Sequence, residues 1–539
     1  MSESFFGLNI AVRGLYTAQK SLDVVNHNLN NVNTPGYSRQ QAIQVAARPM
    51  ALYDGTGMMG TGSDISGVKR VRDEYLDFKY WSENINMGEW QAKQEVLSDV
   101  EVTFNEPSNS GFTTIMNDFY SSLHELAKDP SSTAVRSLVR QKGVTLTKYF
   151  NSTAAHFEKL QEDVNYRIQT KVQEVNSYAT QVQQLNRQIY IAELDGNSAN
   201  DLRDQRTLLV DKMSKIVNIE ANEVVAGKLP NGSDDEHFVI TISGKAIVDH
   251  FDISKLAIVQ RNNSQKVNSE DVENLYEVGW ADGNSLNVKG GEVRGYLDLR
   301  DGNEGGTGPN GIVSPNYKGI PYYQKKLNEF VRTFAMAFNE GYIDSNGDGT
   351  ISPSEDLQGH ADGVGLNGIG GIRFFTYTAV DKLPISSTTF LNGAVNSAAI
   401  VNRYSNITAK NFSVSSEVQN DYNAIAAADT TGEVGNINVL NSLLKTRQNA
   451  KMFAEGAPED FMKSLVATMG VDSQQAKNYQ ANQNVIVKQI ENRRLSDSGV
   501  SMDEEMANMV KFQHAYNASA KMIQTMAEIY DTLINKLGV

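Results

Sequence analysis

Residues 8–37 read LNIAVRGLYTAQKSLDVVNHNLNNVNTPGY and carry a regular apolar repeat. The leucines that recur every seven residues are Leu8, Leu15, Leu22 and Leu29. The apolar series three positions later in the same register is Ala11, Ala18, Val25 and Val32. Such a repeat predicts a helix that packs along another helix. The alternative is an ordinary amphipathic helix on a globular core, and four unbroken heptads favour the paired helix.

An asparagine-rich segment surrounds the last of these leucines. Five asparagines fall within residues 26–33, and Pro35-Gly36 follows shortly after them. Proline disfavours helical geometry at the preceding Thr34, and Pro-Gly marks a turn. The helix is therefore predicted to end in this segment. The asparagines either form a polar helix end or hydrogen-bond neighbouring subunits, and both interpretations remain open.

The C-terminal segment carries a similar repeat, with alternating spacings of four and three. Only Gln513 interrupts its apolar series. That series is Met502, Met506, Met509, Tyr516, Ala520, Ile523, Ala527, Tyr530, Ile534 and Leu537. Ser501 followed by Glu504 predicts a capping box at the start of the helix. The simplest way to bury both terminal seams is to pack them against each other.

A second long helical pattern lies between the two ends. Apolar residues recur at spacings of three and four from Phe157 to Ala192. This length predicts a helix well beyond the average of about 11–12 residues. Asp195-Gly196-Asn197 breaks the pattern, and an amphipathic stretch over 201–216 is expected to return antiparallel to it.

The character of the sequence changes after Ile219. Residues 238–242 and 246–248 are β-type runs separated by a Ser-Gly-Lys turn signal. One apolar helix face, Leu327 to Phe338, interrupts this part, and the pattern is helical again from about 436.

The expected fold is therefore α+β. A long helical bundle or coiled coil, formed by the N- and C-terminal segments, carries an inserted β-rich outer domain. The paired terminal helices are expected in residues 1–45 with 500–539. A mainly helical bundle is expected in 46–221 with 429–499, and the outer domain in 222–428. Because the chain has 539 residues, it is too long for a single hydrophobic core.

Composition excludes several classes of function. A net charge of −15 disfavours binding to nucleic acid or to an anionic membrane surface. The absence of cysteine removes disulfides, thiolate nucleophiles and Cys-based metal sites. The N-terminus lacks the features of a cleavable signal peptide, and no segment approaches the roughly 20 apolar residues of a membrane span. These features alone would indicate a cytoplasmic protein.

Residues 344–355 read DSNGDGTISPSE and fit the calcium-loop pattern D-x-[DN]-x-[DN]-G-x₅-E. The expected metal ligands are Asp344, Asn346, Asp348, Thr350 (through its carbonyl) and Glu355. A helix over 330–342 is expected to enter the loop, whereas the residues after it form a poor helix. The alternative is an Asp/Asn/Gly-rich surface turn. Ca²⁺ is therefore the expected cofactor, as a structural ion rather than a sensor, since no exit helix could move.

Little in the sequence supports catalysis. His124-Glu125 begins like a zincin motif, but Lys128 stands where the second histidine is required. The seven histidines are otherwise scattered, and neither a G-x-S-x-G elbow nor a P-loop occurs. We expect a protein that is not an enzyme.

Four segments together resemble a known family. Residues 22–40, LDVVNHNLNNVNTPGYSRQ, with Gly14-Leu15 before them, resemble the N-terminal motif of flagellar rod, hook and hook-associated proteins. The Ser-Arg-Gln ending is similar to the hook-associated protein 1 branch. Residues 201–206 (DLRDQR), 290–301 (GGEVRGYLDLRD) and 500–509 (VSMDEEMANM) resemble further motifs of that branch, in its order along the chain.

This resemblance implies a structural subunit at the hook–filament junction. Its partners would be copies of itself in a ring, the hook protein, the next hook-associated junction protein toward the filament, and a cytoplasmic export chaperone at the C-terminal region. Export would follow the flagellar type III route, which places the protein outside the cell, in the flagellum, without a cleavable signal. Neither nucleic acid nor a membrane is an expected partner. The residues expected to carry assembly are Leu8, Leu15, Leu22, Leu29, Met506, Met509, Tyr516, Ile523 and Tyr530.

A different class of function remains as the alternative. The chain could be a calcium-dependent surface-binding module, such as an adhesin, on a helical stalk.

If the terminal helices bury their seams only in the polymer, the isolated monomer should have protease-sensitive ends and a protease-resistant centre.

Overall fold

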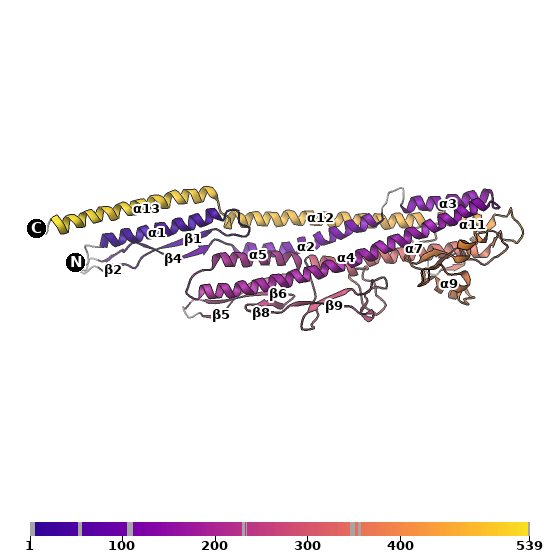
Figure 1. Ribbon diagram of the computed structural model, residues 1–539, viewed down its shortest axis with the longest axis horizontal. Coiled ribbons are helices and arrows are strands. Elements are labelled where there is room, and N and C mark those ends of the chain that lie inside the picture. Colours follow the sequence, from indigo (N-terminus) through magenta and orange to yellow (C-terminus); the bar gives the residue numbers. More distant parts are fainter. Residues whose placement is uncertain are drawn as a thin grey trace.

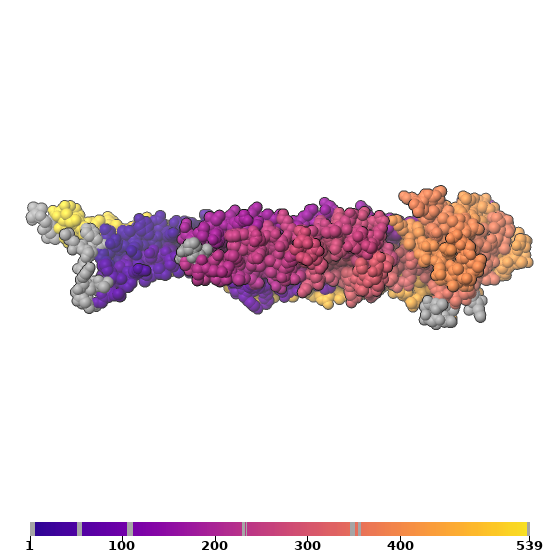
Figure 2. Space-filling view, turned by 90° about the horizontal axis from the view of Figure 1, so that it is seen from below, coloured from indigo at the N-terminus to yellow at the C-terminus, as the bar shows by residue number. Residues whose placement is uncertain are grey.

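A computed structural model of the chain describes residues 6–51, 57–104, 111–228, 232, 234–344, 351–353 and 357–536. The molecule is a long rod with the two ends of the chain at the same tip (Figure 1). The opposite tip is broader and holds the residues around α3, α9 and α11 (Figures 1 and 2). Most helices run along the rod. Within the described ranges, no helix combines the length and the apolar character needed to cross a bilayer.

The helices have the following bounds. They are α1 (Phe6–Asn30), α2 (Glu74–Phe104), α3 (Phe112–Lys128), α4 (Thr133–Glu193), α5 (Asn200–Ile216), α6 (Glu292–Asp301), α7 (Ile320–Glu340), α8 (Ser387–Leu391), α9 (Ser397–Tyr404), α10 (Ser416–Asn420), α11 (Asn438–Lys445), α12 (Pro458–Ser498) and α13 (Met502–Asp531).

The strands are short. They are β1 (Gln40–Ala46), β2 (Met50–Ala51), β3 (Met58–Met59), β4 (Ser63–Arg70), β5 (Ile219–Lys228), β6 (Asp234–Ile242), β7 (Lys245–Asp249), β8 (Asp252–Ile253), β9 (Leu256–Gln260), β10 (Tyr276–Trp280), β11 (Tyr342–Ile343), β12 (Ser352–Pro353), β13 (Val364–Gly365), β14 (Phe375–Tyr377), β15 (Phe412–Val414) and β16 (Ala426–Ala428).

The two terminal helices pack against each other, as the heptads predict. They run antiparallel, because Gly7 lies next to Met526 and Gly14 next to Ser519. A Cβ on Gly14 would lie 3.0 Å from the Ser519 hydroxyl, so the absence of a side chain allows a close approach there. The antiparallel β1–β4 ribbon lies beside α1 and receives a hydrogen bond of 3.2 Å from Thr17 to the Ser63 carbonyl.

One half of the predicted C-terminal seam is shifted by one residue. Met509, Tyr516, Ile523 and Tyr530 are half-buried, as the heptads predict for a helix contact. The companion series of at least half-buried residues is Glu505, Phe512, Ser519 and Met526. Met506, which the repeat places in the seam, is instead 49% exposed. The physical reason is that Gly7 and Gly14 have no side chain. They leave room beside α1 for Met526 and Ser519, which therefore lie in the contact in place of the predicted positions.

The middle of the rod is a helical bundle. The 61-residue helix α4 contains the predicted stripe and begins earlier, at Thr133. It packs against α5 and α6, while α12 packs along α2. Helix α6 approaches α2 closely at Gly295, where a Cβ would lie 2.6 Å from the Glu89 carbonyl.

The largest sheet has four antiparallel strands in the order β5-β6-β7-β8. Its strands β6 and β7 contain the two β-type runs predicted from the sequence. The β9–β10 hairpin follows, and the remaining strands pair only two by two. The long helix α7 also lies within 222–428, together with α6 and three short helices.

The broad tip has an aromatic core. Phe330 and Phe334 of α7 are fully buried, and the Phe330 ring stacks on Phe150 of α4 with a centroid distance of 5.2 Å. Other buried rings of this core are Phe112, Phe119, Phe338, Phe374, Phe375, Phe412, Phe453 and Phe461. This aromatic core is continuous with the core of the bundle and of the largest sheet, in one cluster that runs from Trp81 of α2 to Ala476 of α12. The expectation that the chain is too long for a single hydrophobic core is therefore wrong for these parts, because the 61-residue helix α4 runs through all of them.

Candidate assembly site

Three segments that lie far apart in the sequence meet where the terminal helices join the bundle. They are residues 27–40, the start of α5 and the start of α13. We call this region the terminal joint, and its members are His27, Asn28, Tyr37, Ser38, Arg39, Gln40, Asp201, Asp204, Glu504 and Glu505. It contains parts of three of the four motifs that carry the family resemblance.

The centre of the terminal joint is a buried ion pair. Arg39 Nε donates to Glu505 Oε1 at 2.9 Å, and a terminal guanidinium nitrogen reaches Glu504 at 3.0 Å. Glu505 is 2% exposed, and its second carboxylate oxygen accepts a hydrogen bond of 3.1 Å from Asn28. The backbone N–H of Arg39 also donates to the Ser498 carbonyl at 2.7 Å. These contacts connect the end of α1 with both C-terminal helices.

The buried side chain of Asn28 stabilises the turn after α1 through hydrogen bonds. Its amide donates to the Gln40 carbonyl at 2.9 Å, and its carbonyl accepts the Gln40 N–H at 2.9 Å. The same carbonyl accepts the Tyr37 hydroxyl at 2.8 Å. Burial, together with the carboxylates of Asp201, Asp204 and Glu505, raises the pKa of Tyr37 well above its usual value, so the phenol remains a donor.

Two of the five asparagines in residues 26–33 form a polar helix end and do not serve as contacts for neighbouring subunits. Asn28 is buried, and Asn31 donates back to the His27 carbonyl at 3.0 Å, so both stabilise the chain's own turn. Asn26, Asn30 and Asn33 are exposed.

Asp204 of α5 holds the next residue of the turn. Its carboxylate accepts the backbone N–H of Ser38 at 2.6 Å and the Ser38 hydroxyl at 2.8 Å. Arg70 and Arg72 at the end of β4 lie 3.2 and 3.5 Å from the same carboxylate. A charged group that is buried with several partners fixes a geometry more than it adds stability.

The network continues into the bundle. Arg72 pairs with Asp77 of α2 at 2.6 Å, and Arg494 of α12 bridges Asp77 and Asp211 at 2.9 and 3.0 Å. The indole of Trp81 donates to Asp211 at 2.6 Å, and burial raises the pKa of that carboxyl group. The orientation of the terminal helices is thereby tied to α2, α5 and α12.

An apolar strip remains uncovered on the terminal helices of the single chain. The large apolar side chains that are 47–63% exposed along α13 and the helical turn after it are Met502, Met506, Val510, Met522, Ile529, Leu533 and Ile534. Of the described helix Met502–Asp531, Glu505 alone is buried. On α1, Leu8, Leu15, Leu22 and Leu29 are half-buried, and Tyr16 is 65% exposed. Large apolar side chains exposed in this number along one helix are typical of a surface that a partner covers.

The predicted calcium loop falls mostly outside the described residues. Asp344 is described, whereas Asn346, Asp348, Thr350 and Glu355 are not. Ile343, just before the loop, pairs with Ser352 inside it, because β11 and β12 form an antiparallel pair. The helix expected over 330–342 ends at Glu340, since Gly341 has a φ of 67° and caps it in the left-handed conformation.

Three possible metal ligands come together in the fold, although the histidines are scattered along the sequence and form no motif there. Asp235, His237 and His250 come together through the pairing of β6 with β7. The spacing of 235 and 237 on one strand was visible in the sequence, but the approach of His250 depends on the register of the hairpin.

The joint, the apolar strip and the rod-like bundle are typical of one class of protein, the helical subunits of larger assemblies. Comparison with known families narrows the class. Residues 8–37 match the family described as flagella basal body rod protein, and 491–537 match the C-terminal region of the flagellar basal body rod FlgEFG proteins. Residues 97–348 match the helical domain of the flagellar hook-associated protein FlgK.

Full-length relatives agree with these matches. The chain is 30% identical to flagellar hook-associated protein 1 of Bacillus subtilis, over 100% of this chain and 99% of the relative. It is 26% identical to the Escherichia coli protein of the same name, over 98% and 99%. The fold resembles that of the flagellar hook junction protein FlgK from Burkholderia pseudomallei, with a TM-score of 0.56, 15% identity, and coverage of 80% of this chain and 100% of that one. The chain therefore belongs to the flagellar hook-associated protein 1 family, and it is a structural component of the flagellum.

Proposed function

We propose that this protein forms the junction between hook and filament by polymerising through α1 and α13. The observation that carries the proposal is the uncovered apolar strip on α13, where Glu505 alone is buried in the described helix. Burial of such side chains is worth about 25 cal/mol per Å² of apolar surface, so each copy gains stability when a neighbour covers them. The partners are further copies in a ring, the hook protein on one side and the next hook-associated junction protein on the other.

The terminal joint gives this polymerisation a defined geometry. Subunits that pack through two helices at one tip must hold the rest of the rod at a fixed angle. The buried pair of Arg39 with Glu505, and the bonds of Asp204 to Ser38, supply that constraint. The broad tip, with its aromatic rings, then lies away from the axis.

The sequence is also compatible with export by the flagellar type III route. The flagellar type III route requires an unfolded polypeptide, and a chain without cysteine carries no disulfide that could block its passage. Before export, the apolar strip on α13 is the surface that a cytoplasmic chaperone would cover, by receiving an amphipathic helix in a groove. The protein then acts outside the cell, in the flagellum.

The test is polymerisation onto isolated hook–basal bodies from cells that lack the protein. Purified protein with Ile529→Asp and Met522→Asp should not incorporate, because a charge on each side chain prevents burial of the strip. A matched variant, Val485→Asp, changes a side chain of α12 that is 66% exposed and should incorporate normally. If a chain without residues 502–539 still attaches filament, the junction role is wrong and the alternative of a surface-binding module on a stalk gains support.

We also propose that the loop 344–355 holds a structural Ca²⁺ ion. The support is the sequence pattern together with the β11–β12 pair, which folds the second half of the loop back beside the residues that precede it. Calorimetric titration of the full chain with Ca²⁺ should give heat that Glu355→Gln removes. The matched variant Glu433→Gln, at an exposed acid elsewhere, should retain it. Absence of heat with the unaltered protein would remove the proposal.

A further inference from the structure

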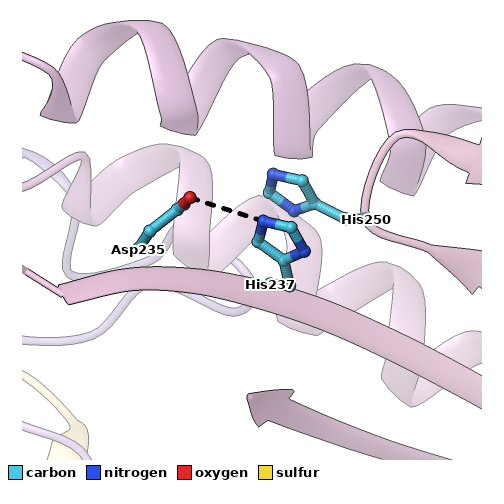
Figure 3. Close-up of side chains that lie close together, drawn as sticks. All are labelled: Asp235, His237 and His250. Carbon is cyan, nitrogen blue, oxygen red and sulfur yellow. Dashed lines mark ion pairs between the residues drawn. The ribbon is translucent and has the colours of Figure 1, made fainter. Parts of the chain in front are cut away.

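The sheet in the middle of the rod brings three potential ligands together. Asp235 and His237 occupy alternate positions on β6, so their side chains project from the same face of the strand (Figure 3). His250 lies in the turn between β7 and β8 and reaches over them. Its backbone N–H donates to the Phe238 carbonyl at 3.1 Å, which fixes the turn across β6.

The donor atoms are close to one another. His237 Nε2 lies 3.5 Å from Asp235 Oδ2. One donor atom from each of Asp235, His237 and His250 lies within 4.8 Å of the other two. The two imidazole rings stack, with centroids 4.0 Å apart and planes inclined by 3°.

The buried position of His250 points to a ligand. The residue is 6% exposed, and neither of its ring nitrogens has a hydrogen-bond partner among the described residues. A buried polar group without a partner costs about 1–3 kcal/mol, so a ligand that satisfies it is favoured. The position is held firmly, because Asn186 of α4 donates to the His250 carbonyl at 2.9 Å and the Tyr190 ring packs edge-on against the imidazole.

We propose that Asp235, His237 and His250 bind one divalent transition-metal ion of the Zn²⁺ type. Two imidazole nitrogens and one carboxylate oxygen are a donor set that zinc accepts, with a fourth position open to solvent. The nearest cation that the site would meet is Arg206, which donates to the same Asn186 side chain that bonds the His250 carbonyl, and its charge is balanced by the pair with Glu223.

Only small movements are needed to close the site. In a tetrahedral zinc site with bonds of about 2.0–2.2 Å, the donors are roughly 3.3 Å apart. The present separations of up to 4.8 Å therefore shrink by rotation of side chains. The stacked rings must turn relative to each other, and the His237 and Asp235 side chains, 35% and 23% exposed, have the freedom to do so. His250 remains the fixed ligand.

The bound ion would connect β6 to the turn after β7, and thus stiffen this end of the sheet. The expected role is structural. It is independent of polymerisation through the terminal helices, which lie at the narrow tip (Figure 1).

The test uses the full chain, purified without a histidine tag and freed of metal with a chelator. Titration calorimetry with Zn²⁺ should show one site of micromolar affinity, and Co²⁺ should give the absorption spectrum of a tetrahedral site. His237→Gln and His250→Asn should each weaken binding by more than the roughly 10–100-fold that loss of an outer-shell partner costs, since each removes a ligand itself. Asparagine is chosen at 250 because the backbone there has a φ of 49°, which asparagine tolerates.

Two controls separate this site from others. His124→Gln, at an exposed histidine of α3, should bind Zn²⁺ as the unaltered protein does. Zn²⁺ should also raise the unfolding temperature of the unaltered protein but not of the two ligand variants. The proposal is overturned if the unaltered protein takes up no Zn²⁺, if the ligand variants bind it equally well, or if Glu355→Gln abolishes the binding instead.

Discussion

The two tips of the rod are built in opposite ways. At the broad tip, Phe330 and Phe334 of α7 are fully buried among other aromatic rings. At the narrow tip, α1 buries chiefly small residues such as Ala11 and Ala18, and α13 in its described span buries Glu505 alone. Packing stabilises most helices in proteins. The broad tip is therefore stable within one chain, whereas under the proposed function the narrow tip would gain stability when neighbouring copies cover it.

The largest expected loss of stability comes from a substitution in the broad tip. Phe330→Ala removes a ring that stacks on Phe150, Phe334 and Phe453, and should lower the free energy of unfolding by about 3–5 kcal/mol. Hydrogen exchange should report the loss in α4 and α7 while the exchange of α13 stays unchanged. Equal loss of protection at both tips would show that they are not independent.

Acid should weaken the broad tip next. His360 is fully buried, and burial lowers its pKa from 6.5 to about 4. It accepts the Ala426 N–H at 2.8 Å and contacts the Ile372 carbonyl at 2.7 Å, which requires the neutral ring. Between pH 6.5 and 4 the unfolded chain binds the extra proton, so stability is complete above this window and falls by on the order of 3 kcal/mol across it.

The measurement is the denaturant midpoint of the broad tip as a function of pH. His360→Leu should flatten the decrease between pH 6.5 and 4, although it lowers stability at neutral pH. His124→Gln, at an exposed site, should leave the decrease as it is. An unchanged slope in His360→Leu would assign the acid sensitivity to other groups.

A smaller effect is expected at the terminal joint. Glu505→Ala leaves Arg39 and Asn28 without their buried partner. It should lower the local stability of the terminal joint by about 1–3 kcal/mol. Faster hydrogen exchange and earlier proteolysis in residues 28–40 would report it. The matched change is Glu504→Ala, whose side chain is 62% exposed and whose pair with Arg39 should contribute no more than about 1 kcal/mol. Equal effects of the two variants would contradict a specific role for the buried pair.

The smallest effect on the single chain is expected on the apolar strip. Ile529→Ala changes a side chain that is 47% exposed, and should alter the stability of the monomer by no more than about 0.5 kcal/mol. The same variant should incorporate less efficiently into isolated hook–basal bodies, whereas Val485→Ala on α12 should not. A monomer strongly destabilised by Ile529→Ala would mean that the narrow tip already has a core of its own.

The sequence was sufficient to predict the pairing of the two terminal helices, because a heptad repeat is a local pattern with a clear physical meaning. It was not sufficient to place every member of the seam. Glu505 and Ser519 lie on the contact side, although neither is apolar, since Asn28 and Arg39 satisfy the carboxylate and Gly14 leaves room for the hydroxyl.

The polar contacts of the joint illustrate the same limit. The motif residues Ser38 and Asp204 are separated by 166 positions, and nothing local in either segment indicates that they bond. The cluster of Asp235, His237 and His250 likewise depends on strand register. Periodicity predicts which face of an element is buried, whereas the partners of single polar residues follow from tertiary structure.

The antiparallel pairing of α1 with α13 also leads us to expect a particular order of folding. Asn28 and Glu505 bond across 477 positions, so this contact has nearly the largest loop-closure entropy that the chain allows. The α4–α5 hairpin and the sheet beside it depend on contacts much nearer in sequence and can form first. A chain that emerges with its N-terminus first would hold α1 without its intramolecular partner until the last helix arrives. We therefore expect the narrow tip to be the last part of each subunit to fold, once α13 is available to pair with α1.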